Sequence, residues 1–199
     1  MIVTLRSDDE VVHKVLISDE AIVQFGARVG EVIHTEKISH LADLAQRTKA
    51  FDIATAALAA KGRSRRELER SMLRKGIRDV HVGATLDRLE GVGLIDDAAF
   101  ARAYVRAKVT GRGTSIWAIR RALGQKGVSR EQADAAIVEV MDEQEVDELA
   151  VALAEGTKRL RVLQRLEPTV AKRRLTAFLA RRGFPAAIVR AVVHTLLGR

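Results

Sequence analysis

The sequence predicts a mainly α-helical protein: a tandem array of three three-helix repeats behind a small N-terminal segment that contains a β-hairpin. Three observations lead to this fold class. A pattern of apolar residues around a Lys-Gly or Arg-Gly pair occurs three times, 47% of the residues are hydrophobic, and only 4% are aromatic. Cores built from Leu, Val, Ile and Ala suit small helices that pack closely together.

The N-terminal segment, residues 1–38, is expected to form a hairpin and a short helix. Residues 2–6 and 10–17 are rich in β-branched side chains, and the Ser-Asp-Asp between them is typical of a turn. The short helix is predicted over residues 19–25, where Gly26 would end it.

The three repeats are expected over residues 39–92, 93–144 and 145–199. Each repeat begins with one helix, and a pair of helices joined at a glycine follows it. The three opening helices are predicted from an N-cap at Ser39 to about Ala60, ended by Gly62; from Ala98 to Val109; and from Val146 to Lys158.

The glycines of the pattern are Gly76, Gly127 and Gly183, which lie 51 and 56 residues apart. This spacing predicts a helix, a tight turn with glycine in the left-handed conformation, and a second helix whose apolar stripe returns at i, i+4 and i+7. With each glycine as position zero, apolar residues fall at −8, −4, +1, +6, +10 and +13: Leu68, Met72, Ile77, Val82, Leu86 and Leu89; Ile119, Leu123, Val128, Ala133, Ile137 and Val140; Leu175, Leu179, Phe184, Val189, Val193 and Leu196.

Capping signals agree with these helix pairs. Proline is favoured at a first helical position, and Pro168 and Pro185 stand where the helices of the third repeat should begin. The predicted side-chain caps are Ser64 with Glu67, Ser129 with Gln132, and Asp79 for the second helix of the first pair.

Composition and net charge reduce the number of functions that the protein could have. The chain has no cysteine, which excludes disulfides, thiolate zinc sites and a cysteine nucleophile. Its first residues have no apolar targeting core, and no stretch is apolar enough to cross a membrane, so a cytoplasmic protein is expected. The net charge of +8 and a pI near 10.3 favour a polyanionic partner such as single- or double-stranded DNA over a merely basic surface.

The charge alternates in blocks along the chain. Residues 102–130 carry +8 without one acidic side chain, residues 131–155 carry −9, and residues 156–190 carry +9. Arg66, Arg70 and Arg74 recur every four residues, which places them on one helix face. In the 102–130 block no neighbouring carboxylates would offset the repulsion between cations, and a polyanion would relieve it. The alternative is an ordinary solvated helix surface.

Several strings resemble the RecX family, the bacterial modulators of the RecA recombinase. They are ALAAKGRSRRELERSMLRKG (57–76), GLIDDAAFA (93–101), GTSIWAIRRALGQKGVS (113–129) and RRLTAFLARRGFPAAIV (173–189). The chain departs from the family pattern at Gly124, where a bulkier residue is expected, and the third repeat lacks the capping box.

This resemblance implies an elongated helical protein, without enzymatic activity or cofactor, that binds RecA and RecA–single-stranded DNA filaments. It would restrain strand exchange, ATP hydrolysis and co-protease activity, and so act in homologous recombination, DNA repair and the SOS response, most simply as a monomer. The candidate RecA- or DNA-binding residues are Arg63, Arg65, Arg66, Arg70, Arg74, Lys75, Arg102, Arg106, Lys108, Arg112, Arg120, Arg121, Lys126, Arg173, Arg174, Arg181 and Arg182.

Other patterns have competing interpretations. Asp96 and Asp97 could form a magnesium site, but their place before an apolar helix favours capping. Glu31 and His34 are a weak metal-ligand pair, and no phosphate-binding loop or catalytic constellation is present in the sequence.

Trp117 and Tyr104 could stack on bases, but their helical spacing favours core packing. The acidic block 131–155 has three open roles: it could pair with its own basic neighbours, repel DNA, or meet a basic partner. The rival function is a free-standing helix-turn-helix-like DNA-binding protein, against which the threefold repetition without a dimerisation helix argues.

Overall fold

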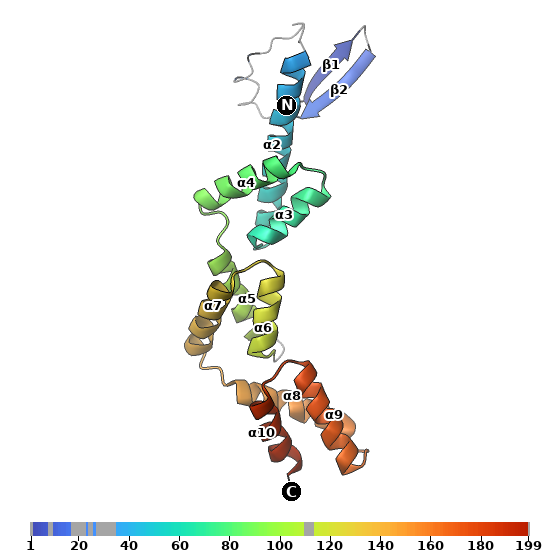
Figure 1. Cartoon of the computed structure of the whole chain (residues 1–199), viewed down its shortest axis with the longest axis vertical. Coiled ribbons are helices and arrows are strands. Elements are labelled where there is room, and N and C mark those ends of the chain that lie inside the picture. Colours follow the sequence, from blue (N-terminus) through green and yellow to red (C-terminus); the bar gives the residue numbers. More distant parts are fainter. Residues whose placement is uncertain are drawn as a thin grey trace. The chain divides into compact units, whose positions relative to one another are not determined.

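The structure, a computed structural model, describes residues 2–7, 10–16, 23, 26, 35–109 and 114–198 (Figure 1). These residues are mainly helical, which confirms the helical part of the predicted fold class. The chain divides into two compact units, Met1–Asp96 and Asp97–Arg199.

The first unit opens with an antiparallel pair of strands, β1 (Ile2–Ser7) and β2 (Glu10–Leu16). Ile2 pairs with Leu16, and Ser7 pairs with Glu10. The short helix predicted over residues 19–25 lies outside the described residues, apart from Val23.

Helix α2 (Thr35–Ala60) is longer than predicted. It begins before Ser39, so the proposed N-cap at Ser39 is wrong. Glu36 and Lys37 are good helix formers, and they allow the helix to begin about one turn earlier.

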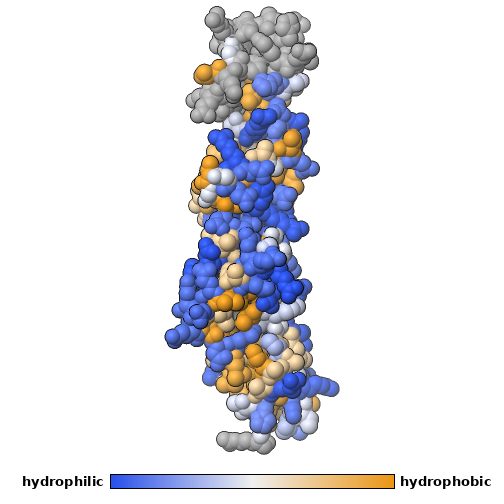
Figure 2. All heavy atoms as spheres, turned by 60° about the vertical axis from the view of Figure 1, so that its left-hand side comes forward, coloured by the Kyte–Doolittle hydropathy of each residue, from blue (hydrophilic) through white to orange (hydrophobic). Residues whose placement is uncertain are grey.

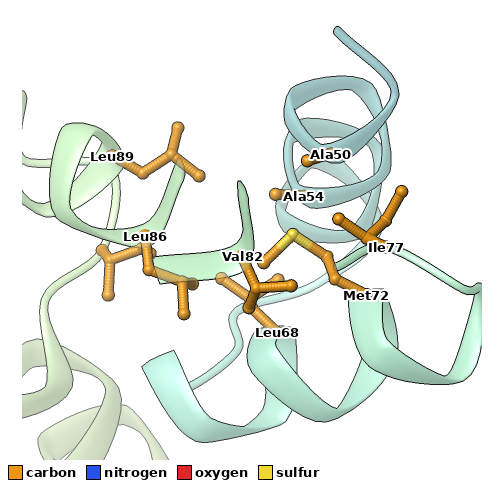
Figure 3. Packing of buried hydrophobic residues seen from close by; sticks show 9 residues of the cluster. Ala50, Ala54, Leu68, Met72, Ile77, Val82, Leu86 and Leu89 are labelled. Atoms are coloured by element: carbon orange, nitrogen blue, oxygen red, sulfur yellow. The ribbon is translucent and has the colours of Figure 1, made fainter. Parts of the chain in front are cut away.

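Helices α2, α3 (Arg65–Arg74) and α4 (Asp79–Gly91) share one core, and we call them the first triplet. Figure 3 shows how the core is built: Met72 and Ile77 lie beside the small side chains of Ala50 and Ala54 on α2, while Val82, Leu86 and Leu89 line α4. The alanines carry little side-chain volume, so the neighbouring side chains can pack close to the α2 backbone.

The caps of this triplet are partly as predicted. The Ser64 side chain accepts a hydrogen bond from the Glu67 backbone, and the Glu67 side chain accepts one from the Ser64 backbone, which confirms the capping box. Asp79 is not a cap, because it is the first residue of α4 and Arg78 occupies the N-cap position. The Asp79 carboxylate still lies at the positive end of the helix dipole.

The second unit contains two further triplets, each with its own core. The second triplet is α5 (Asp97–Val109), α6 (Ile116–Gln125) and α7 (Arg130–Glu143). Helix α5 begins directly after Asp96, in agreement with a capping position, and Ser129 with Gln132 forms the predicted capping box.

The third triplet is α8 (Glu148–Leu163), α9 (Pro168–Arg181) and α10 (Ala186–Leu197). Helix α8 begins later and ends later than predicted. Its start is set by the Asp147 side chain, which caps the helix by accepting a hydrogen bond of 2.8 Å from the Leu149 backbone. Pro168 is the first residue of α9, and Pro185 directly precedes α10.

The apolar pattern is confirmed as the source of the three cores. Every residue of the pattern is buried except Leu196, which is half-buried against the third core. The three glycines adopt the predicted left-handed conformation, with φ of 77° at Gly76, 87° at Gly127 and 84° at Gly183.

We predict that Gly76→Ala lowers the free energy of unfolding by about 1–2 kcal/mol, because an L-residue is strained at this φ. Gly62→Ala is the matched control, since a Cβ also meets open space there but φ is not positive. Urea unfolding followed by circular dichroism measures both variants. Equal midpoints for the two would contradict the role of the left-handed turn.

Candidate nucleic-acid interface

In each helix pair, the first helix buries the residues that lie eight and four positions before the glycine. Helix α3 buries Leu68 and Met72 and exposes Arg66, Arg70 and Arg74. The arginines therefore lie on the face that points away from the core of the first triplet, as their spacing indicates. Lys75, which caps the C-terminus of α3, is also exposed.

Helix α9 of the third triplet presents a comparable cationic face. It buries Ala171, Leu175 and Leu179, and exposes Arg173, Arg174 and Arg181. Our sequence-based candidates left out five further exposed cations of this triplet, although the charge of +9 over residues 156–190 could have indicated them: Lys158, Arg161, Arg165, Lys172 and Arg190.

Helix α6 differs from α3 and α9, because its exposed face combines one ring with one cation. Trp117 is 50% exposed, so the expectation that it packs in the core is wrong. The Arg121 guanidinium, one turn later, is exposed and lies 5.5 Å from the centre of the indole ring. Tyr104, by contrast, packs against the core of the second triplet.

Much of the basic block 102–130 is neutralised inside the second triplet. Helix α7 supplies the carboxylates: Arg102 lies 3.8 Å from Glu139, Arg106 lies 2.8 Å from Glu143, and Arg120 hydrogen-bonds Asp134. The hydrogen bond to Glu143 and the charge of Glu143 raise the pKa of Arg106. The expectation that no carboxylates offset these cations is therefore wrong, because the α5–α7 and α6–α7 packing brings distant segments together.

The acidic block accordingly pairs, in part, with its own basic neighbours. Besides the ion pairs of α7 with Arg102, Arg106 and Arg120, Glu148 accepts a hydrogen bond of 2.9 Å from the Ile116 backbone, which ties the second triplet to the third. The Ser115 hydroxyl donates a hydrogen bond of 2.8 Å to the Arg182 carbonyl at the same junction.

Two further candidates hold helices together. Arg65 donates hydrogen bonds to Asp87 and Glu90 of α4, and the Asp87 hydrogen bond raises the pKa of Arg65. Arg182 lies 2.8 Å from the carboxylate of Glu155, whose side chain is only 9% exposed. These interactions give both arginines a structural role.

The remaining candidate binding residues are two lysines and two arginines of the first and second triplets and the segment between α5 and α6. Lys126 lies 5.7 Å from the ring centre of Phe100 and 5.5 Å from that of Tyr104, and Lys108 lies 5.3 Å from Tyr104, so both lysines contact aromatic rings of α5. Arg63 is half-buried, and Arg112 lies outside the described residues.

The described surface is predominantly hydrophilic on the face that Figure 2 shows, and hydrophobic side chains form separate patches there. Among the described residues, no group of three or more His, Asp or Glu side chains is arranged to hold a metal ion. Asp97 is the first residue of α5 and directly follows Asp96. No helix in the described part of the chain is both long and apolar enough to span a bilayer.

Comparisons with known proteins agree with the helical triplets. A family model described as the second three-helix domain of RecX matches residues 96–137, and one described as the third matches residues 145–193. The regulatory protein RecX of Amycolatopsis mediterranei is 35% identical over 145 residues, which cover 73% of this chain and 81% of its own length. The one of Thermobifida fusca is 37% identical over 66% of this chain and 70% of its own length.

Solved structures share the fold. A crystal structure of a regulatory protein RecX matches with a TM-score of 0.73 at 20% identity, over 98% of this chain and 93% of the other. RecX from Lactobacillus salivarius matches with a TM-score of 0.64 at 19% identity, over 76% of this chain and 96% of the other.

We predict that Arg182→Ala destabilises the second unit by about 1–3 kcal/mol, because it leaves the buried Glu155 carboxylate with Lys158 as its remaining ion-pair partner in the described structure. The destabilisation should be below that of a fully buried pair, since Arg182 is itself about a third exposed. Arg181→Ala is the matched control, because the neighbouring side chain is exposed. Thermal unfolding of both variants tests the assignment, and an equal decrease in stability would refute it.

Proposed function

The chain belongs to the RecX family of regulatory proteins, and from this we propose that it binds RecA and RecA–single-stranded DNA filaments and restrains strand exchange, ATP hydrolysis and co-protease activity. It acts in the cytoplasm as a monomer, without enzymatic activity of its own. The repeats at residues 39–92, 93–144 and 145–199 provide the successive binding surfaces.

The observation that carries this proposal is the exposed arginine face of α3, where Arg66, Arg70 and Arg74 project away from the core. Helix α9 also exposes three arginines, Arg173, Arg174 and Arg181, with a different spacing. Exposed cations on a repeated helix face can bind a polyanion at several points, and they can equally bind acidic side chains of RecA.

The ion pairs of the second triplet weaken the binding of its basic residues to an anionic partner. Arg102, Arg106 and Arg120 already face carboxylates of α7, so a phosphate that bound them would have to compete with those partners. Because the arginine faces of α3 and α9 are exposed, we assign the main electrostatic interactions to these two helices, and we treat Arg121 as the principal exposed candidate of α6.

The alternative function, a free-standing DNA-binding protein, has one supporting observation. Helices α3 and α4 are joined by a short turn at Gly76, as in a helix-turn-helix. Gel shifts with naked single strands, duplex and RecA-coated DNA separate the two functions. Preference for RecA-coated DNA supports the regulator, and preference for a duplex of defined sequence supports the alternative.

We predict that replacing Arg66, Arg70 and Arg74 together by Ala weakens inhibition of RecA strand exchange at least several-fold while the helical content stays native. If the arginines bind phosphates, the log–log salt slope of binding to single strands should fall by about 0.7 for each phosphate that is no longer neutralised. If they bind acidic RecA side chains, inhibition falls while the affinity for naked DNA is unchanged.

The matched control replaces Arg47, Lys49 and Lys61 by Ala, which removes the same charge from positions on and beside α2. This control should inhibit strand exchange as the parent does. A folded α3 variant that also inhibits as well as the parent would remove the binding surface from α3.

We also predict that the purified chain hydrolyses neither ATP nor DNA by itself, because the sequence has no phosphate-binding loop. Phosphate release and nuclease assays with magnesium test this expectation. Turnover that follows the protein through successive columns, and that disappears on its unfolding, would contradict it.

A further inference from the structure

Trp117 occupies a position that belongs to the cationic helix face in the other two helix pairs. It lies ten residues before Gly127, as Arg66 lies before Gly76 and Arg173 before Gly183. Burial of a tryptophan ring stabilises a fold, yet this ring is half exposed in the described structure. An aromatic surface thus replaces a cation at this place.

The ring is held in place by the third triplet. A Cβ at Gly183 would lie 2.5 Å from Cε3 of Trp117 and 3.3 Å from Cζ3, so the glycine leaves room for the indole. The backbone beside Trp117 is also tied down, because the Ser115 hydroxyl donates to the Arg182 carbonyl and the Ile116 amide donates to Glu148. The Trp117 side chain is thus already ordered, so it loses little conformational entropy when a ligand binds its exposed surface.

Arg121 adds a cation to this aromatic surface. Its guanidinium lies 5.5 Å from the ring centre and is exposed to solvent. The face of an indole ring is electron-rich, and a guanidinium beside it can also stack on planar groups or bind phosphate. Trp117 and Arg121 together offer a flat apolar surface with a positive edge.

We propose that Trp117 and Arg121 form a stacking site for an unstacked nucleobase of a single strand. The inference rests on the proposed function and deepens it by naming where a base, rather than a phosphate, is bound. Bases of a single strand expose both π faces, whereas those of a duplex are stacked and do not reach a side chain on a helix surface. An acidic protein surface fits this site less well, because a carboxylate is repelled by the electron-rich face of the ring.

Fluorescence gives a direct measurement, since Trp117 is the single tryptophan of the chain. The full chain is titrated with three DNAs of equal length: oligothymidine, an abasic deoxyribose-phosphate strand, and a duplex. Oligothymidine should quench the tryptophan emission. The abasic strand should bind through its phosphates at low salt without comparable quenching, and the duplex should quench weakly.

The variants separate stacking from charge. Trp117→Ala should bind oligothymidine about 5- to 150-fold more weakly, measured by anisotropy of a labelled strand, since stacking of one base contributes on the order of 1–3 kcal/mol. Trp117→Phe should keep most of the affinity. Val138→Ala, which shortens an apolar side chain that is 70% exposed on α7, is the control and should bind as the parent does.

Three results would overturn the stacking site: equal affinity of Trp117→Ala and the parent for oligothymidine, equal quenching by the abasic strand, or no binding of the parent to naked single strands. If Trp117→Ala loses binding to RecA-coated DNA alone, the ring binds protein, and the proposed function stands without the site. If the ring stacks on bases but the parent does not bind RecA-coated DNA, the site stands and the proposed function fails.

Discussion

The three triplets depend on the left-handed glycine between their last two helices. At Gly76, Gly127 and Gly183 the chain must end one helix, change direction and begin the next within a few residues. The turn places the apolar residue after each glycine, such as Ile77 or Phe184, into the core that both helices share. Because each triplet has a small core of mainly aliphatic side chains, a poorly directed helix would expose a large part of it.

Ion pairs between helices involve several basic residues of the second triplet. Helix α7 packs against α5 and α6, and its carboxylates lie beside Arg102, Arg106 and Arg120. On α3 and α9, by contrast, arginines are exposed along the face opposite the core. The net charge of +8 thus does not indicate which basic residues are exposed, because several cations of the second triplet lie beside carboxylates of α7.

Features that depend on neighbours in the chain could be predicted from the sequence. The capping boxes at Ser64 and Ser129 need residues three apart, and the apolar stripes need only helical periodicity. Features that depend on packing between distant segments could not. Arg106 and Glu143 are 37 residues apart, and Trp117 lies beside Gly183 of the third triplet. Glu145, with φ of 49°, takes a left-handed conformation that its residue type does not indicate.

The exposed positions of the three helix pairs differ much more than their core positions. At ten, six and two residues before the glycine, α3 carries Arg66, Arg70 and Arg74, whereas α6 carries Trp117, Arg121 and Gln125. The corresponding positions of α9 are Arg173, Ala177 and Arg181. Since the cores require the same apolar pattern in each copy, these outward positions are where the copies can differ without loss of the fold. The three helix pairs therefore present different side chains at these positions of one repeated scaffold: three arginines on α3, a ring, a cation and an amide on α6, and two arginines with an alanine between them on α9.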